Sequence, residues 1–274
     1  MKFINILLIL IILLLNSCSK NLQKKTDLNE KSLDLQVLET YEEGMKSLKS
    51  GDILFAAKKF NEVEVIFPQS EWAPRSALMA AYSYYSQDYY GDAISELERF
   101  FRVYPNHKNL DYAYYLISLS YYEQIVDEKK DLNSIVKAKY YFEILKNNFP
   151  NTDYGIDAEF KLDLIDDILA SKEMYIGRYY FEKRKWISAI NRFRTVVDEY
   201  DTTVYSEEAL YRLVEIYYTL GLKSESQKYA ILLGYNYGSS EWYKKSYNIF
   251  NKRYADNEKN KKKNLITKFK SLFN

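Results

Sequence analysis

The middle of the chain repeats one pattern of small, aromatic and apolar residues at a spacing of about 37 residues. The first four copies contain, in order, Gly44, Ala56, Phe60, Val63 and Pro68; Ala81, Tyr84, Ala93, Leu97, Phe100 and Pro105; Ser118, Tyr121, Ala138, Phe142, Leu145 and Pro150; and Gly177, Tyr180, Ala189, Phe193, Val196 and Asp201. A fifth, weaker copy extends from about Tyr211 to Gly238. Because one such unit cannot cover its own apolar face, the copies must stack on one another.

The pattern of each copy predicts two helices joined by a turn. Segments such as Ser50-Gly51-Asp52 and Gly221-Leu222-Lys223 separate two stretches with helical apolar spacing. A chain with only 8 Gly and 4 Pro is too poor in turn residues for a β-sandwich. The pattern matches the tetratricopeptide repeat. The sequence therefore predicts an all-α fold, a right-handed superhelical solenoid of about five tetratricopeptide repeats over residues 36–252.

The N-terminus has the features of a bacterial lipoprotein signal. A charged start is followed by an apolar run over residues 3–15, which is shorter than the roughly 20 residues that a membrane crossing requires. The run ends in small residues before Cys18, the only cysteine of the chain. We expect residues 1–17 to be a signal peptide, cleaved before Cys18. An ordinary signal peptide followed by an incidental cysteine is the alternative.

Cys18 is the predicted lipidation site, with an S-diacylglycerol and an N-acyl group. Such an anchor holds a protein stably at a membrane, because each buried CH₂ contributes about 0.8 kcal/mol. Ser19 follows, where an aspartate would resemble an inner-membrane retention signal, so we expect the periplasmic face of the outer membrane. The polar residues 18–35 read as a flexible tether between the lipid and the solenoid.

The composition argues against several kinds of active site. With one histidine, His107, and one cysteine, the chain lacks the imidazoles and thiols of metal sites and of catalytic triads. Asp166 and Asp167 are adjacent to each other on one predicted helix near Asp163, a pattern that favours a solvated face over acid/base chemistry. Charges of 39 Lys and Arg against 38 Asp and Glu give no basic excess for nucleic acid. We therefore expect neither an enzyme, nor a metal or other cofactor, nor a nucleic-acid partner.

Short sequence segments within the repeats resemble those of the BamD family of outer-membrane assembly lipoproteins. They include Phe67-Pro68-Gln69-Ser70-Glu71-Trp72-Ala73, Tyr112-Ala113-Tyr114-Tyr115-Leu116, Gly177-Arg178-Tyr179-Tyr180 and Trp186-Ile187-Ser188-Ala189-Ile190-Asn191-Arg192. The resemblance extends over about residues 36–252, with Asp201 in place of the fourth proline. It implies a non-enzymatic scaffold of the β-barrel assembly machine. Its expected partners are the POTRA region of BamA, other assembly lipoproteins and unfolded outer-membrane proteins.

The same resemblance implies that the two halves of the solenoid have different functions. It implies that residues 36–150 receive the C-terminal signals of unfolded barrel proteins, and that residues 151–252 bind BamA. On the partner side, Glu173, Arg178 and Arg192 are the expected BamA-binding residues. For Arg192 the alternative is an intramolecular ion pair with Glu173 or Glu199.

Four residues after the first helix-closing proline are predicted to line a peptide groove: Trp72, Arg75, Tyr82 and Tyr85. Tyrosine suits such a groove, because its ring buries area at low entropic cost while its hydroxyl meets backbone groups. A terminal carboxylate also calls for a nearby cation, which Arg75 supplies. The alternative for Trp72 is that it only fills the gap between two repeats.

The last segment, residues 253–274, is a basic tail. From Lys252 onward it holds eight basic residues against Asp256 and Glu258. Its apolar residues share one helical face: Leu265, Ile266, Phe269, Leu272 and Phe273. It could therefore lie on an anionic lipid surface, dock in a groove, or remain a frayed soluble end.

A second function for the whole chain stays open. A periplasmic tetratricopeptide lipoprotein could instead act as an adaptor for cell-wall hydrolases or proteases, because this repeat fold serves many functions.

Overall fold

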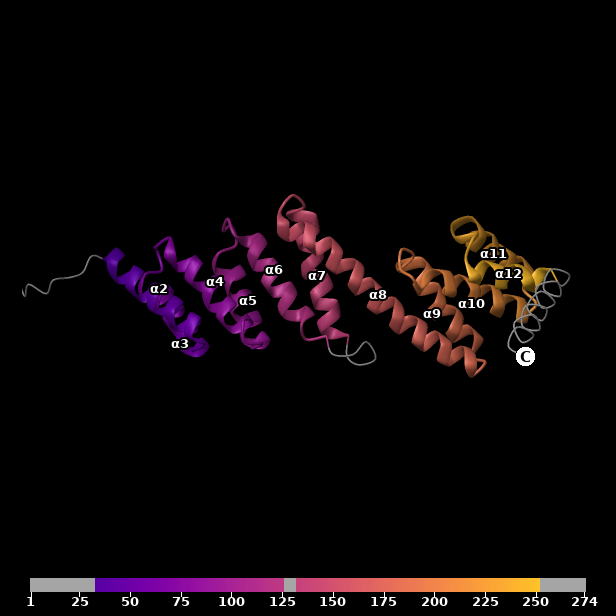
Figure 1. The fold of residues 1–274 in the computed structure, drawn as a ribbon, viewed down its shortest axis with the longest axis horizontal. Helices are drawn as coiled ribbons and strands as arrows, with labels where there is room; N and C mark the ends of the chain where they lie inside the picture. Colours follow the sequence, from indigo (N-terminus) through magenta and orange to yellow (C-terminus); the bar gives the residue numbers. More distant parts are fainter. Residues whose placement is uncertain (1–32, 126–131, 252–274) are drawn as a thin grey trace, which may run out of the picture.

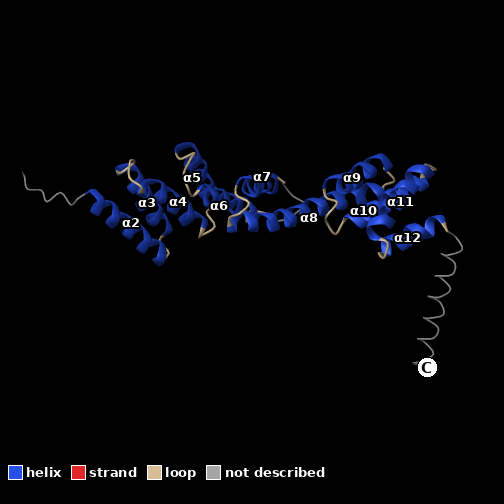
Figure 2. Cartoon of the chain, turned by 90° about the horizontal axis from the view of Figure 1, so that it is seen from above, coloured by secondary structure: helices blue, strands red, loops and turns tan. Residues whose placement is uncertain are grey.

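The computed structural model describes residues 33–125 and 132–251, and within them the chain is helical without a β-strand (Figures 1 and 2). The helices are α2 (Leu33–Ser50), α3 (Ile53–Ile66), α4 (Trp72–Tyr85), α5 (Tyr90–Val103), α6 (Leu110–Tyr122), α7 (Asn133–Asn148), α8 (Asp153–Glu182), α9 (Trp186–Glu199), α10 (Ser206–Thr219), α11 (Lys223–Tyr237) and α12 (Glu241–Phe250). Figure 1 shows them in an elongated array, with α2 at one end and α12 near the other. Helix α2 begins three residues before the expected start of the solenoid at residue 36.

The helices form five consecutive pairs, which confirms the predicted solenoid. The pairs are α2 with α3, α4 with α5, α6 with α7, α8 with α9, and α10 with α11. In addition, α2 contacts α4, α4 contacts α6, and α6 contacts α8. The first helices of successive repeats therefore line up along one face of the first half of the molecule.

The small and large residues of the repeat pack against each other in the core. Ala56, Ala93, Ala138 and Ala189 are each 0% exposed, as are Phe60, Leu97, Phe142 and Phe193. Where the first helix has glycine, the contact is tightest: a Cβ on Gly177 would lie 2.6 Å from Cε1 of Phe193. The spacing read from the sequence thus identifies the close approach of the two helices in a repeat.

An aromatic residue ends the second helix of each of the first four repeats. Phe67, Tyr104, Phe149 and Tyr200 have φ between −125° and −133°, and each backbone N–H donates to the carbonyl four residues earlier. In three of the turns a Ser or Thr hydroxyl then donates to the aromatic residue's own carbonyl. Tyr200 adopts this geometry before Asp201, so the turn does not depend on the proline that the first three copies have there.

The turns inside the repeats share a left-handed residue. Gly51, Asp88, Arg184 and Gly221 have φ between 55° and 83°. The backbone N–H of the following residue reaches back five residues in each turn, for example from Lys185 to Tyr180. Glycine adopts this conformation without steric cost, whereas Arg184 and Asp88 adopt it under the constraint of the two flanking helices.

Helix α8 joins the two halves of the solenoid as one continuous element of 30 residues. It begins at the cap of Thr152, whose side chain accepts a hydrogen bond from Gly155 N–H at 3.1 Å. Its first half packs against α7 through Leu162 and Ile165, and its second half packs near α9 through Met174. The expected division at residues 150 and 151 therefore lies at the start of a helix that belongs to both halves (Figure 1).

Helix α12 follows the fifth repeat and was not anticipated as a separate element. Ser240 caps it by accepting a hydrogen bond from Tyr243 N–H at 3.1 Å, and it packs against α10 and α11. Among the residues that the structure describes, no helix is both long and apolar enough to cross a membrane. The signal peptide, Cys18, residues 126–131 and the basic tail lie outside the described residues.

Candidate functional site

Helix α4 presents a polar and aromatic face toward the side where the first helices line up. Arg75 and Tyr82 are seven residues apart, so they lie two turns apart on the same side of the helix. Tyr82 is 37% exposed, and Tyr85 is partly buried beside Tyr90 at a ring distance of 5.8 Å. The sequence analysis predicted that these side chains share one surface. Arg75 and Tyr82 lie on the same side of α4, and Tyr85 lies at the edge of that side.

Tyrosines from the next two repeats extend this surface. Tyr112 and Tyr115 of α6 lie 5.7 Å and 4.9 Å, ring to ring, from Tyr154 of α8. Burial raises the pKa of Tyr112, and the neighbouring Tyr82, Tyr154 and Tyr85 raise it further. The rings of α4, α6 and α8 are therefore close neighbours. We call Tyr82, Tyr85, Tyr112, Tyr115 and Tyr154 the tyrosine groove, after the predicted peptide groove that these residues would line.

Carboxylates lie near two tyrosines of the groove: burial and the charges of Glu123 and Asp88 raise the pKa of Tyr85. The hydroxyl of Tyr115 donates to Asp157 Oδ2 at 2.9 Å, and burial together with this hydrogen bond raises the pKa of Tyr115. Beyond it, Lys161 lies 4.7 Å above the ring of Tyr122. The side chains of the groove thus offer aromatic faces, and the hydroxyl of Tyr115 is already paired with Asp157.

Trp72 has a different environment from the two predicted tyrosines. Its ring packs against Tyr41 of α2 at 4.9 Å and against the apolar cluster of Val37, Val63 and Phe67. The guanidinium of Arg75 lies 5.3 Å above the same ring. Trp72 therefore packs between two repeats, and its ring supports Arg75.

Trp72 and Arg75 also line a cleft of about 470 Å³ at the N-terminus of α4. The opposite wall is the turn before α6, with His107 and Lys108. Burial and the charge of Lys108 lower the pKa of His107, and its Nδ1 accepts a hydrogen bond from Asn109 N–H at 3.2 Å. His107 is a turn residue, as expected, and the cationic groups of the cleft are Arg75 and Lys108.

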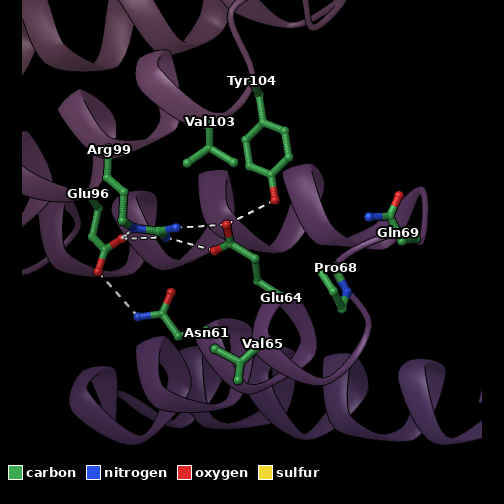
Figure 3. A pocket seen from close by; sticks show the side chains of 9 residues that line it. All are labelled: Asn61, Glu64, Val65, Pro68, Gln69, Glu96, Arg99, Val103 and Tyr104. Atoms are coloured by element: carbon green, nitrogen blue, oxygen red, sulfur yellow. Dashed lines mark hydrogen bonds and ion pairs between the residues drawn. The ribbon is translucent and has the colours of Figure 1, made fainter.

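A larger cleft of about 730 Å³ lies between α3 and α5 (Figure 3). At its centre, Arg99 donates to both oxygens of Glu64 at 2.7 Å, and Tyr104 donates to the same carboxylate at 2.9 Å. Arg99 also donates to Glu96. Because its central charges are paired with each other, this cleft acts first as a clamp between the second helices of two repeats.

In the half of the solenoid predicted to bind a partner, Arg192 of α9 forms an ion pair with Glu173 of α8. Its Nη1 donates to both carboxylate oxygens, at 3.0 Å and 3.1 Å. The intramolecular ion pair considered as an alternative is therefore present. The side chain of Arg192 nevertheless remains 42% exposed, whereas that of Glu173 is 16% exposed, so the guanidinium is the part that a partner can reach.

Arg178 belongs to a second charge network, between α8 and α10. It donates to Glu208 from Nε and from Nη2, and Arg212 donates to both Glu208 and Glu215. Residues five apart on a helix point about 140° apart. The structure thus pairs Glu173 with Arg192 but directs Arg178 toward a different neighbour, so the three predicted residues do not form one cluster.

The acidic residues of α8 give no catalytic or metal constellation. Asp166 forms an ion pair with Lys139 at 2.6 Å, while Asp163 is exposed. Asp166 therefore holds α7 against α8 and is not simply solvated, which corrects the sequence interpretation. In the described part of the chain, no group of three or more His, Cys, Asp and Glu side chains could hold a metal ion.

Sequence reasoning missed Tyr112, Tyr115 and Tyr154 as groove residues, and Glu208 and Arg212 as charge partners. A signal for Tyr112 exists, because it occupies in the third repeat the place that Arg75 holds in the second, at the repeat spacing. The pair of Arg178 and Glu208 had no signal, because its members are 30 residues apart, whereas Glu208 and Arg212 have the i,i+4 spacing of a helical ion pair.

The chain is similar in sequence to several outer membrane protein assembly factors. A family model described as "YfiO: Outer membrane lipoprotein" matches residues 33–232. The outer membrane protein assembly factor BamD of Rickettsia prowazekii (strain Madrid E) is 41% identical over 242 residues, which cover 88% of this chain and 94% of that protein. The factor of the same name from Caulobacter vibrioides is 39% identical over 77% of this chain and 69% of its own length. Among solved structures, MamA aligns at 16% identity with a TM-score of 0.33, over 76% of this chain and 97% of that one.

Proposed function

Because this chain belongs to the YfiO/BamD family of outer membrane lipoproteins, we propose that it is a non-enzymatic scaffold for the assembly of outer-membrane β-barrel proteins. Its first three repeats bind the C-terminal segments of unfolded barrel proteins, and its last repeats bind the POTRA region of BamA. Further assembly lipoproteins complete the complex. A lipid on Cys18 anchors the chain at the periplasmic face of the outer membrane.

The tyrosine groove is the observation that carries this proposal. Extended peptides bind where pockets accept alternate side chains and polar groups meet the backbone. Along α4, the distance from Arg75 to Tyr82 is about 10 Å, at 1.5 Å per residue. An extended strand advances about 7 Å for every two residues. A terminal carboxylate near Arg75 and Lys108 would thus bring apolar side chains two to four positions upstream onto the tyrosine groove.

Binding in this groove should be weak. A micromolar dissociation constant corresponds to about −8 kcal/mol, and a scaffold that passes its client onward must release it readily. Aromatic rings and one or two cations suit this requirement, because they give contact area without a buried charge network.

The groove is tested by photo-crosslinking in living cells. A photoreactive amino acid at Tyr82 or Tyr112 should capture an unfolded barrel protein, and deletion of the client's final aromatic residue should abolish capture. Tyr140 of α7 is the matched control, since it is a tyrosine with 55% exposure on the second helix of its repeat. Equal capture at Tyr140, or capture unaffected by the deletion, would show that the groove does not read this signal. Capture of cell-wall hydrolases in place of barrel proteins would favour the adaptor function.

The anchor is tested by metabolic labelling with palmitate. The native chain should incorporate label, and Cys18→Ser should not, because the thiol is the attachment point of the diacylglycerol. The variant should also leave the outer-membrane fraction. A native chain that takes up no label would refute lipidation at Cys18.

A further inference from the structure

The C-terminal end of the described chain has an apolar cleft of about 680 Å³ between α11 and α12. Helix α11 contributes Gln227, Ala230, Ile231, Gly234 and Tyr235, and α12 contributes Tyr243, Ser246, Tyr247 and Phe250. Ile231 is 72% exposed and Tyr235 is 88% exposed. Such large side chains rarely stand exposed together unless something covers them. We call this surface the α11/α12 cleft.

The residues that line the α11/α12 cleft have the sequence spacing typical of a surface that binds a helix. On both helices the lining residues recur three and four positions apart, which places them on one stripe. Ala230 is small and only partly buried, so a third backbone can approach closely at this position. Gly234 already admits the ring of Tyr243, since a Cβ there would lie 2.6 Å from Cε2 of that ring. The cleft is therefore shaped for an amphipathic helix more than for a flat surface.

The position of the α11/α12 cleft in the solenoid explains why it is uncovered. Each repeat buries its apolar face against the next one, so the last repeat requires a cap with a polar outer face. Helix α12 covers α10 and part of α11 but leaves Ile231 and Tyr235 exposed. The family match ends at residue 232, so α12 and all that follows it lie beyond the matched region.

We propose that residues 265–273 of this chain occupy the α11/α12 cleft and complete the C-terminal cap of the solenoid. Leu265, Ile266, Phe269, Leu272 and Phe273 recur at the same three- and four-residue spacing as the cleft walls. Phe250 lines the cleft and is followed after Asn251 by 13 mostly polar residues, 252–264. A coil of that length spans roughly 20 Å, from about 5–6 Å × √n, which is enough to return to α11. The basic residues Lys268 and Lys270 then flank the buried stripe and contribute to the polar outer face.

A crosslinking experiment tests this contact in the full-length chain. Cys18→Ser removes the only native thiol, and Ile231→Cys is combined with Phe269→Cys. The control combines Ile231→Cys with Ser271→Cys, because in a helix position 271 would lie on the side opposite to the apolar stripe. After treatment with a short bismaleimide, the first pair should give at least tenfold more intramolecular crosslink by peptide mapping. This yield should not change on twentyfold dilution.

Three results would overturn the proposal. Equal yields for the two pairs would show that the tail has no preferred face toward the cleft. Crosslinks between two chains that decline on dilution would assign the cleft to a second copy. Crosslinking of the first pair that is lost when phosphatidylglycerol vesicles are added at physiological ionic strength would assign the tail to anionic lipid.

A second measurement covers the case in which the cysteine variants fold poorly. Leu272→Glu should raise deuterium exchange in α11 and α12 several-fold, because a charge in the stripe disfavours docking, while exchange in α3 to α5 stays the same. Thr267→Glu, on the polar side of the tail, is the control and should leave both regions unchanged. Unaltered exchange of α11 and α12 in Leu272→Glu would contradict the proposal.

Discussion

At the scale of single residues, two positions need glycine because a side chain would collide with a neighbouring ring, and not because the backbone adopts an unusual conformation. Gly44 and Gly177 lie within helices, and a Cβ at either position would lie under 3 Å from the ring of Phe60 or Phe193. Both rings are fully buried, so neither can swing away. The glycine–phenylalanine pair therefore sets the distance between the two helices of the first and fourth repeats.

Gly177→Ala should destabilise the fourth repeat by about 1–2 kcal/mol, because overpacking against Phe193 outweighs the gain in helix propensity. Urea unfolding followed by circular dichroism measures the change. Gly91→Ala in α5 is the control, since an added Cβ there meets nothing within 4 Å. It should raise stability by about 0.5–1 kcal/mol. A destabilisation of Gly177→Ala that persists when Phe193→Leu is added would show that the ring is not the cause.

At the scale of the elements, ion pairs fix the angle between helices that the apolar contacts leave adjustable. Arg99 clamps α3 to α5, Arg192 clamps α9 to α8, and Arg178 clamps α8 to α10. The Arg178 clamp is extended by Arg212, whose guanidinium lies over the rings of Phe181 and Trp242. Helices α8, α10 and α12 are thus joined by one charged and aromatic contact set.

Stability of the C-terminal repeats should decrease in acid because of Glu208. Burial alone would raise the pKa of Glu208, but hydrogen bonding and the charges of Arg178 and Arg212 bring it below the ordinary value of 4.5. A group with a lowered pKa in the folded state stabilises fully above the unfolded value, and this contribution is lost as the pH falls through the folded value. The loss should therefore appear below about pH 4.5.

Urea unfolding between pH 3 and pH 7 measures this contribution. Glu208→Gln should cost about 1.5–3 kcal/mol at pH 7, the range for hydrogen bonds to charged groups. The difference from the native chain should shrink toward pH 3. Glu207→Gln, the neighbouring residue on α10, is the control and should cost little. A cost of Glu208→Gln that is constant with pH would exclude the carboxylate charge as its source.

At the scale of the whole molecule, α8 connects the proposed client groove to the proposed partner surface. Its first turns contribute Tyr154 to the tyrosine groove, and its last turns contribute Glu173 and Arg178 to the charge networks. No loop separates the two halves along this helix. A rigid helix of 30 residues, about 45 Å long at 1.5 Å per residue, holds the two surfaces at a fixed spacing.

The partner surface is tested by exchanging the charges of one ion pair. Arg192→Glu should weaken binding of the BamA POTRA region tenfold or more, because like charges in an interface cost several kcal/mol. Combining Arg192→Glu with Glu173→Arg restores the internal ion pair and should restore thermal stability. If Arg192 itself contacts the partner, calorimetry should still show weak binding in the double variant.

The control for this exchange is Arg194→Glu, an exposed position on the same helix. It should retain near-native affinity. Recovery of binding in the double variant would mean that the partner needs only the correct α8–α9 geometry. Native affinity in the single variant would remove Arg192 from the interface.

The sequence by itself determined the repeat, the paired helices and the core. The period of small and large apolar residues is a local property, and it already identifies which face of each helix is buried. Ala56, Ala93, Ala138 and Ala189 could therefore be placed in the core from their spacing alone, and all four are buried. The assignment of Trp72, Arg75, Tyr82 and Tyr85 to a peptide groove stays a prediction.

Only the tertiary structure decided which side chains meet across repeats. The 37-residue period does not specify how far each repeat rotates relative to the last, and this rotation determines that Tyr112 and Tyr154 meet and that Arg178 faces Glu208. The continuity of α8 and the position of α12 likewise depend on contacts with neighbouring helices. Short-range patterns fix what is buried, whereas the pairing of distant residues is set by the summed packing of the whole array.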